Sequence, residues 1–478
     1  MALAGVCRGT ARGLLSAAAE PALAVGCLQL VRGLATGTGA AAAAAAGEGE
    51  QPTHVFDDGG DIVGTYTPVT KRLWQQRYKW TDDKLAAAAP RDPAAQLVKP
   101  PKLTTVVYPF SSDEVLREHY KNPWNTVRIA RVLEDLDSLA GFVAYEHCDD
   151  GDPATRPPLL VTATVEAIQL SSSQLSLQHD MAMRGRVAWT GTSSMDIRME
   201  LEQGGKQQLT ALFTFVARDA LSGKPFAINS LEPQSQQDRE LFEQRLRINQ
   251  ERKAARKRSA GSGSGGKLQH VSAEAERWAE QLLAAAKTKR DLPALADANL
   301  LLMDDTSLEN TFTCQPQQRN MHGRIFGGFL MRRAFELAHS TAYLFAGCRP
   351  RTGKRGRPPS PVDQITFQRA VNVGDLIKFK SRVTRAWALP DQPGQGVVHL
   401  QVEASVTQPE RLSSEVTNTM NFLFQVDLRC DAAGHFIPPK QVLPSTEQQA
   451  LEVAALFGPG GRKQSIAPAA GSRGRGAP

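Results

Sequence analysis

The sequence predicts an α+β fold built from two copies of one unit, each a helix followed by a meander of antiparallel strands. Two observations lead to this prediction. A helix-like spacing of apolar residues occurs twice, at 127–148 and at 324–347. Each helix pattern is followed by strand patterns rich in Val, Ile, Thr and Phe and bounded by turn residues. A helix and a meander bury their apolar faces against each other, which gives a unit of roughly 120 residues.

The strand patterns come in the same order in both copies, with a period of about two hundred residues. They cover 159–170, 180–203 and 208–219 in the first copy, and 362–387, 396–408 and 417–427 in the second. The segments "GTSSM" and "ALPDQPGQG" supply turns. Two such sheets in one chain form a tandem pseudo-dimer, and they can pair edge to edge.

These patterns place the first unit at 100–230 and the second at 295–430. Residues 231–294 lie between them and read as a charged, exposed helix, a Gly/Ser stretch and a second helix with Ser272 as its cap. We interpret this segment as a connector, with a regulatory or nucleic-acid-binding arm as the alternative. Residues 72–100 show no strong structure, and the tail at 458–478 is predicted to be disordered.

Residues 1–48 have the composition of an organellar targeting segment. They contain Arg8, Arg12 and Arg32 among many Ala, Leu, Gly and Ser residues, and Arg12 interrupts the apolar block that a secretory signal would need. The composition favours the mitochondrial matrix first and a plastid second. These residues are excluded from the fold prediction.

Charge and cysteine content exclude several classes of protein. The net charge of +7 is concentrated at 245–258, 349–358 and the C-terminal tail, without the aromatic interleaving of a nucleic-acid binder, so no nucleic acid is expected as a partner. No apolar run of membrane-spanning length occurs beyond the Ala-rich N-terminus, so we expect no membrane span. The six cysteines are dispersed and indicate neither a metal site nor a disulfide framework.

Three acids lie on the first helix pattern. Asp135 and Asp137 flank its apolar stripe on opposite sides, whereas Glu134 points away from it. Arg131 precedes Glu134 by three positions and Asp135 by four, so both can belong to a surface ion-pair cluster. Asp137 has no oppositely charged partner three or four positions away and is therefore the first candidate for a catalytic acid, with Asp135 as its substitute.

The second helix pattern is apolar nearly all round, which indicates a helix enclosed by other structure. Gly327 and Gly328 at its start allow either close packing or the approach of a ligand to free N–H groups. Glu336 lies four residues after Arg332, so it is either a catalytic acid or an ion-pair partner.

Both helix patterns, with the turns before them, resemble those of a known family. "RNMHGRIFGGFLMRRAFELA" at 319–338 and "NTVRIARVLEDLDSLAG" at 125–141 resemble mitochondrial double-hotdog acyl-CoA thioesterases of the thioesterase 9 type. "VAWTGTSSMDIRMEL" at 187–201 and "TFVARD" at 214–219 fit the same family. The resemblance implies a tandem hotdog fold, in which each sheet wraps a central helix.

The same resemblance implies hydrolysis of an acyl-CoA to a free acid and CoA, without a metal or redox cofactor. An acidic side chain activates water, and a helix-start N–H and an asparagine hold the carbonyl oxygen or the water. Hotdog sites combine the loop of one unit with the helix acid of the other. Asn320, Gly327 and Gly328 would therefore form one site with Asp137.

The reciprocal site would combine Asn125 with Glu336. Ala130 and Arg131 stand where the second helix has its glycine pair, and the alignment of the two helices sets Ser138 opposite Glu336. We therefore expect one strong site and one weak or lost site.

Lys354 and Arg355 are candidate CoA phosphate contacts, with a merely charged loop as the alternative. The family also implies a homo-oligomer of tandem hotdogs, for example a trimer. Two rival functions stay open. One is another acyl-thioester chemistry, hydration or dehydration, and the other is a non-catalytic scaffold that binds acyl-CoA or RNA.

Overall fold

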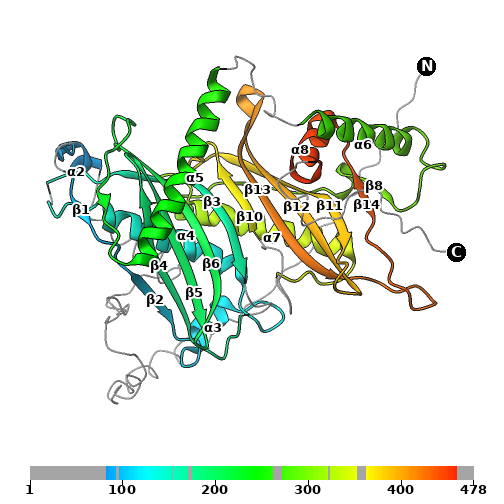
Figure 1. Ribbon diagram of the computed structural model, residues 1–478, viewed down its shortest axis with the longest axis horizontal. Helices are drawn as coiled ribbons and strands as arrows, with labels where there is room; N and C mark the ends of the chain where they lie inside the picture. Colours follow the sequence, from blue (N-terminus) through cyan, green and yellow to red (C-terminus); the bar gives the residue numbers. More distant parts are fainter. Residues whose placement is uncertain are drawn as a thin grey trace, which may run out of the picture. The chain divides into compact units, whose positions relative to one another are not determined.

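A computed structural model describes residues 82–92, 96–152, 154–170, 175–261, 272–320, 323–352 and 362–459. Its centre is one antiparallel sheet of ten strands in the order β2-β4-β5-β6-β3-β10-β13-β12-β11-β9 (Figure 1). The predicted targeting segment at 1–48 lies outside the described residues, as does nearly all of the tail predicted to be disordered.

The first half of the sheet surrounds helix α4, which spans Ile129–Cys148. Its strands are β2 (Thr104–Tyr108), β3 (Leu159–Leu170), β4 (Met181–Thr190), β5 (Ser194–Gln203) and β6 (Lys206–Arg218). A short helix, α3 (Glu114–Tyr120), precedes α4. The predicted helix and strands of this unit are confirmed, and one strand is added ahead of the helix.

The second half surrounds helix α7, which spans Gly327–Ala346. Its strands are β9 (Leu308–Thr313), β10 (Val362–Phe367), β11 (Leu376–Ala388), β12 (Gln395–Gln408) and β13 (Ser413–Asp427). Read inward from its own edge, each half has its first strand, then its third, fourth and fifth, and then its second. The α+β prediction is therefore confirmed, and the order of strands repeats between the halves.

The two halves join through β3 and β10, which pair antiparallel with Val165 opposite Ile365. Helices α4 and α7 contact each other and the strands of their own halves. Leu133, Leu136 and Leu139 of α4 are fully buried, and Met331 and Ala334 of α7 are as well. One hydrophobic core therefore runs through both halves, because each helix places its apolar stripe against its own sheet.

The connector is more firmly attached than the sequence suggested. Helix α5 (Gln236–Gly261) crosses the first half of the sheet (Figure 1). Arg245 of α5 is buried and donates to Asp196 on β5 at 2.8 Å and to Glu166 on β3 at 3.0 Å. Arg252 also pairs with Glu166. The prediction of a solvent-exposed helix is thus wrong for this face, since part of the basic run at 245–258 neutralises acids of the sheet.

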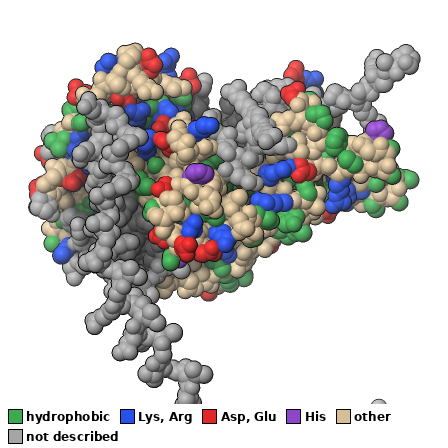
Figure 2. All heavy atoms as spheres, turned by 90° about the horizontal axis from the view of Figure 1, so that it is seen from below, with side chains coloured by type: hydrophobic (Ala, Val, Ile, Leu, Met, Phe, Trp, Pro, Cys, Tyr) green, Lys and Arg blue, Asp and Glu red, His purple; other side chains and the backbone are tan. Residues whose placement is uncertain are grey.

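The remaining elements are small or peripheral. They are α2 (Asp82–Ala87), β1 (Val98–Lys99), β7 (Ser230–Leu231), α6 (Ala273–Asp291), β8 (Leu300–Leu302), β14 (Gln441–Leu443) and α8 (Glu447–Phe457), with short 3-10 turns at Asp304–Thr306, Pro316–Gln318 and Pro409–Arg411. The side chain of Ser272 accepts the N–H of Ala275 and caps α6, as predicted. On the face shown in Figure 2, Lys and Arg side chains lie among Asp and Glu. No helix in the described part of the chain is long and apolar enough to cross a membrane.

We expect Arg245→Ala to lower the free energy of unfolding by about 3–5 kcal/mol, because it leaves the fully buried carboxylate of Asp196 without its cation. Urea unfolding measures the change. Arg247→Ala is the matched control, since Arg247 is exposed on the same helix and its loss is expected to change stability by less than about 0.5 kcal/mol. Equal effects of the two substitutions would contradict this account of how α5 docks.

Candidate active site

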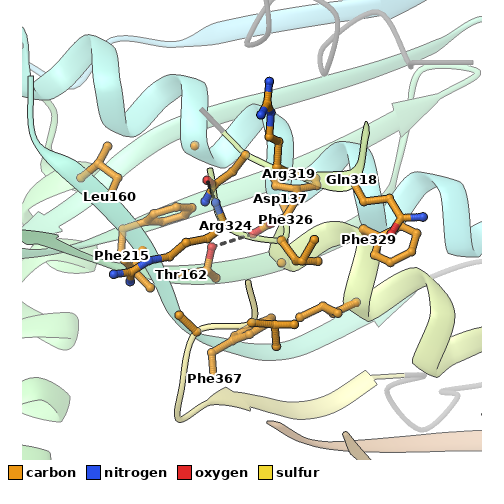
Figure 3. Close-up of a pocket in the computed structure, with 18 of the residues that line it drawn as sticks. Asp137, Leu160, Thr162, Phe215, Gln318, Arg319, Arg324, Phe326, Phe329 and Phe367 are labelled. Atoms are coloured by element: carbon orange, nitrogen blue, oxygen red, sulfur yellow. Dashed lines mark hydrogen bonds between the residues drawn. The ribbon is translucent and has the colours of Figure 1, made fainter. Parts of the chain in front are cut away.

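A cavity of about 610 Å³ lies where the two halves meet. Its walls come from α4, from β3 and β6, from the loop that leads into α7 and from the segment after β10. Figure 3 shows Asp137 and Thr162 joined by a hydrogen bond, with Leu160 and Phe215 to one side and Phe329 to the other. The cavity thus combines a buried acid with aromatic and aliphatic walls.

Asp137 is the centre of the polar contacts in this cavity. Its carboxylate accepts the N–H of Gly328 at 2.7 Å and the hydroxyl of Thr162 at 2.9 Å. Burial raises the pKa of Asp137 from 3.8 to about 6, while the hydrogen bonds from Thr162 and Gly328 oppose the rise. Such a carboxyl group can take up and release a proton near neutral pH.

The glycine pair serves both packing and the site. A Cβ on Gly328 would lie 2.8 Å from the backbone oxygen of Glu134, so only glycine lets α7 approach α4 this closely. A Cβ on Gly327 would lie 3.0 Å from the carboxylate of Asp137. The N–H of Gly328 is used by that carboxylate, whereas the N–H of Gly327 meets no acceptor among the described residues.

Asn320 lines the same cavity from the turn before α7. Its side-chain oxygen accepts the N–H of Arg324 at 3.1 Å, and Gly323 provides the left-handed residue of this turn with φ 78°. The structure therefore brings together the four residues predicted for the stronger site: Asn320, Gly327, Gly328 and Asp137.

The cavity is strongly basic. Six arginines and two acids line it: Arg131, Arg218, Arg319, Arg324, Arg332, Arg369, Glu134 and Asp137. Arg332 of α7 pairs with Glu134 of α4 at 2.8 Å, and Arg131 lies 3.7 Å from the same carboxylate. The prediction that Glu134 points away from the packed face is wrong, because that face of α4 meets α7 rather than water.

Asp135 lies away from this cavity. It is fully buried and accepts hydrogen bonds from the hydroxyl of Tyr108 at 3.1 Å and from that of Tyr120. The predicted surface ion pair with Arg131 is therefore wrong, because Asp135 is buried. Its predicted role as a substitute for Asp137 does not fit either, because it does not line this cavity. Asp135 instead satisfies two tyrosines inside the core of the first half.

The reciprocal place is built on the same frame with different residues. Helices α4 and α7 begin 198 residues apart, at Ile129 and Gly327, so Phe335 takes the place of Asp137. Ile129 and Ala130 stand where α7 has its glycine pair, so the predicted match with Ala130 and Arg131 is wrong by one position. Glu336 does not pair with Arg332 as the sequence suggested; it pairs with Arg128, just before α4. This place therefore has no equivalent of the buried acid.

Asn125 is also placed differently from its prediction. It is exposed and occupies the left-handed position of the turn, with φ 57°, as Gly323 does in the other half. The matching asparagine is Asn122, whose side chain accepts the N–H of Thr126 at 3.1 Å. A second cavity of about 430 Å³ lies here, and Asn122 and Glu336 line it.

Other functional candidates were missed or cannot be placed. Lys354 and Arg355 lie outside the described residues. Thr162 was missed because a threonine on a strand looks like an ordinary strand residue. It follows Leu160 by two positions on β3, so both side chains lie on the same face of the strand, and this spacing was the available signal. Arg319 and Arg324 flank Asn320 in the loop and also line the cavity.

Comparison with known proteins gives relatives over most of the chain. It is 41% identical over 399 residues to acyl-coenzyme A thioesterase 2, chloroplastic, of Humulus lupulus, covering 81% of this chain and 87% of that protein. It is 31% identical over 416 residues to acyl-coenzyme A thioesterase 9, mitochondrial, of Mus musculus, covering 83% and 88%. No protein-family model matches the chain. A solved structure of a putative oleoyl thioesterase from Lactobacillus plantarum aligns at 7% identity over 69% of this chain and 98% of its own, with a TM-score of 0.38.

We expect Gly328→Ala to destabilise the fold by about 1–3 kcal/mol, since its Cβ must push α4 and α7 apart. Gly141→Ala is the matched control on α4, because a Cβ there meets nothing within 4 Å and alanine favours a helix. Thermal unfolding of both variants measures the difference. A Gly328→Ala variant as stable as Gly141→Ala would show that the helices do not approach closely at this point.

Proposed function

The chain belongs to the acyl-coenzyme A thioesterase family, and we propose that the cavity around Asp137 is where it hydrolyses an acyl-CoA to a carboxylic acid and CoA. Identities of 31–41% over most of the chain support the family and the reaction. The observation that carries the choice of site is the hydrogen bond from Gly328 of α7 to Asp137 of α4. This contact puts an acid of one half at a helix start of the other.

An organellar location agrees with the names of these relatives, which are mitochondrial or chloroplastic. The mitochondrion is the first choice and a plastid the second. A targeting role of residues 1–48 rests on their composition alone.

The thioester carbonyl lies beside Asp137 with its oxygen at the N–H of Gly327. This N–H is at the first position of α7, where the helix dipole favours negative charge. The amide group of Asn320 is a second donor toward the carbonyl oxygen or the attacking water. Hydrogen-bond donors that are already in position stabilise the negative charge that develops on the oxygen. Such stabilisation lowers the activation free energy by several kcal/mol.

Asp137 is the general base in this scheme. Its carboxylate accepts a proton from water as the water oxygen bonds to the carbonyl carbon, and a tetrahedral oxyanion forms. When the oxyanion collapses, the carbon–sulfur bond breaks and the proton on Asp137 passes to the leaving sulfur of CoA. The products are the carboxylic acid and the CoA thiol, and the carboxylate is restored.

The arginines of the loop serve the other end of the substrate. Arg319 and Arg324 line the cavity close to Asn320, and guanidinium groups bind phosphate oxygens well. The walls formed by Leu160, Phe215 and Phe329 suit an acyl chain or the pantetheine arm.

The repeated strand order supports a finer description of the fold as a double hotdog, with one hydrolytic site per chain. Assembly into a homo-oligomer stays a prediction. The strands β2 and β9 end the ten-stranded sheet, and edges of this kind can pair with another chain.

The reaction is tested with the mature chain and a panel of short to long acyl-CoAs, with release of free thiol as the readout. We expect thiol release with at least one chain length. Products that keep the acyl group on CoA would indicate hydration or dehydration instead, and no turnover across the panel would exclude hydrolysis.

Asp137→Asn is expected to lower kcat by about 10²–10⁴, because the amide cannot accept a proton from water. Burial raises the pKa of Asp137 from 3.8 to about 6. Above about pH 6, where the buried group is ionised, this shift lowers the free energy of unfolding by about 3 kcal/mol. The variant should therefore be at least as stable as the wild type at pH 8. Loss of both activity and stability at that pH would point to a structural role.

The rate should fall as pH falls through about 6, because Asp137 acts as the carboxylate, and it should be about tenfold lower one unit below that value. Thr162→Val removes a donor that favours the carboxylate, so this acidic limb should move to higher pH. Measurement of kcat against pH for both proteins checks the shift. If the acidic limb lies at the same pH in both proteins, Thr162 does not influence the ionisation of Asp137.

A further inference from the structure

The second cavity, of about 430 Å³, lies at the start of α4 and beside the middle of α7. It is the counterpart of the first cavity, because Asn122 and Asn320 close the same turn 198 residues apart and each accepts a backbone N–H at 3.1 Å. The shared frame gives it the shape of a ligand site.

This second cavity does not hold the hydrolytic groups. Phe335 lines it where the first cavity has Asp137, and Ala130 stands where α7 has Gly328. The only carboxylate among its described lining residues is that of Glu336, which is paired with Arg128. A thioester bound here would meet no buried general base.

The charged side chains at this cavity leave a surplus of positive charge. Lys121 pairs with Glu118 and Arg351 with Asp427. Among the described residues, Arg349 has no acid as an ion-pair partner, and its guanidinium lies over the ring of Trp124 instead. Partial burial and the nearby charge of Arg351 lower the pKa of Arg349, which still carries its charge at neutral pH. An anion placed between these guanidiniums would be stabilised.

An aromatic surface lies beside that charge. The guanidinium carbon of Arg349 is 4.0 Å from the ring centre of Trp124, and the ring of His339 is 5.7 Å from Trp124. Trp124 is 38% exposed, so part of its ring is open to a ligand. The two ring planes are tilted by 46°, and burial lowers the pKa of His339, so this ring is neutral at pH 7. A stacked tryptophan and arginine are suited to a purine ring.

We propose that this second cavity binds, without hydrolysing it, a ligand that carries an adenosine diphosphate group, with the base on Trp124 and the phosphates on Arg349 and Arg351. CoA and free ADP both carry this group. The inference rests on the proposed function only in naming CoA as one of these two sources.

The test counts CoA molecules bound per chain by isothermal titration, in an Asp137→Asn background that keeps both cavities. Two are expected, and adding Trp124→Ala with Arg349→Ala should reduce the number to one. Arg411→Ala is the control, since Arg411 is exposed on the second half and outside both cavities. The milder Arg349→Gln should weaken the second binding event about tenfold or more, and it guards against loss of folding.

One CoA per chain in the parent protein, or two in the Trp124→Ala, Arg349→Ala variant, would overturn the inference. A repeat with ADP separates the sources. If ADP gives a binding event that the Trp124→Ala, Arg349→Ala variant loses, the second cavity binds the free nucleotide. If only CoA gives an event that this variant loses, the second cavity binds CoA. Failure of the proposed function is seen separately, because the wild-type chain would then release no thiol while its second cavity still bound the ligand.

Discussion

The hydrogen bond from the N–H of Gly328 to the carboxylate of Asp137 joins residues that are 191 positions apart. It can form only because two other conditions hold. Strands β3 and β10 pair and set the two halves side by side. Glycine at 328 removes the Cβ that would strike Glu134, so the start of α7 reaches α4. Burial then raises the pKa of Asp137, and the bond limits that rise. A packing requirement and a chemical requirement thus meet in one contact, which explains why the glycines at this helix start serve both.

The two halves share a frame and differ in chemistry. Equivalent positions hold Asp137 and Phe335, or Gly328 and Ala130, so the same turn and helix start produce two different cavities. In the first, an acid faces amide donors. In the second, Glu336 is held by Arg128, and aromatic and cationic side chains dominate. A tandem repeat within one chain permits this divergence, because each half is free to change without changing its partner. A symmetric dimer of identical chains would carry any such change into both of its sites.

Most of the fold was predictable because helix and strand periods are local properties of the sequence. Both central helices and the long strands were found in this way. The edge strands β2 and β9 were not, since each is short and β9 is largely exposed, which leaves little apolar alternation. Asp137 was identified because it lacks a basic partner three or four positions away on its own helix. Glu134, Asp135 and Asn125 were misplaced, because the groups that fix them lie on other segments or in a turn. Contacts between segments distant in sequence are what single-sequence periodicity cannot see.

The place where the thioester carbonyl binds is tested most directly by a crystal structure of the chain with an acyl-CoA analogue. In this analogue a methylene group replaces the thioester sulfur. We predict its carbonyl oxygen at hydrogen-bond distance from the N–H of Gly327 and its carbonyl carbon beside the carboxylate of Asp137. A carbonyl bound beside Glu336, with the first cavity empty, would contradict the claim that the site is formed by the helix acid of the first half and the helix start of the second.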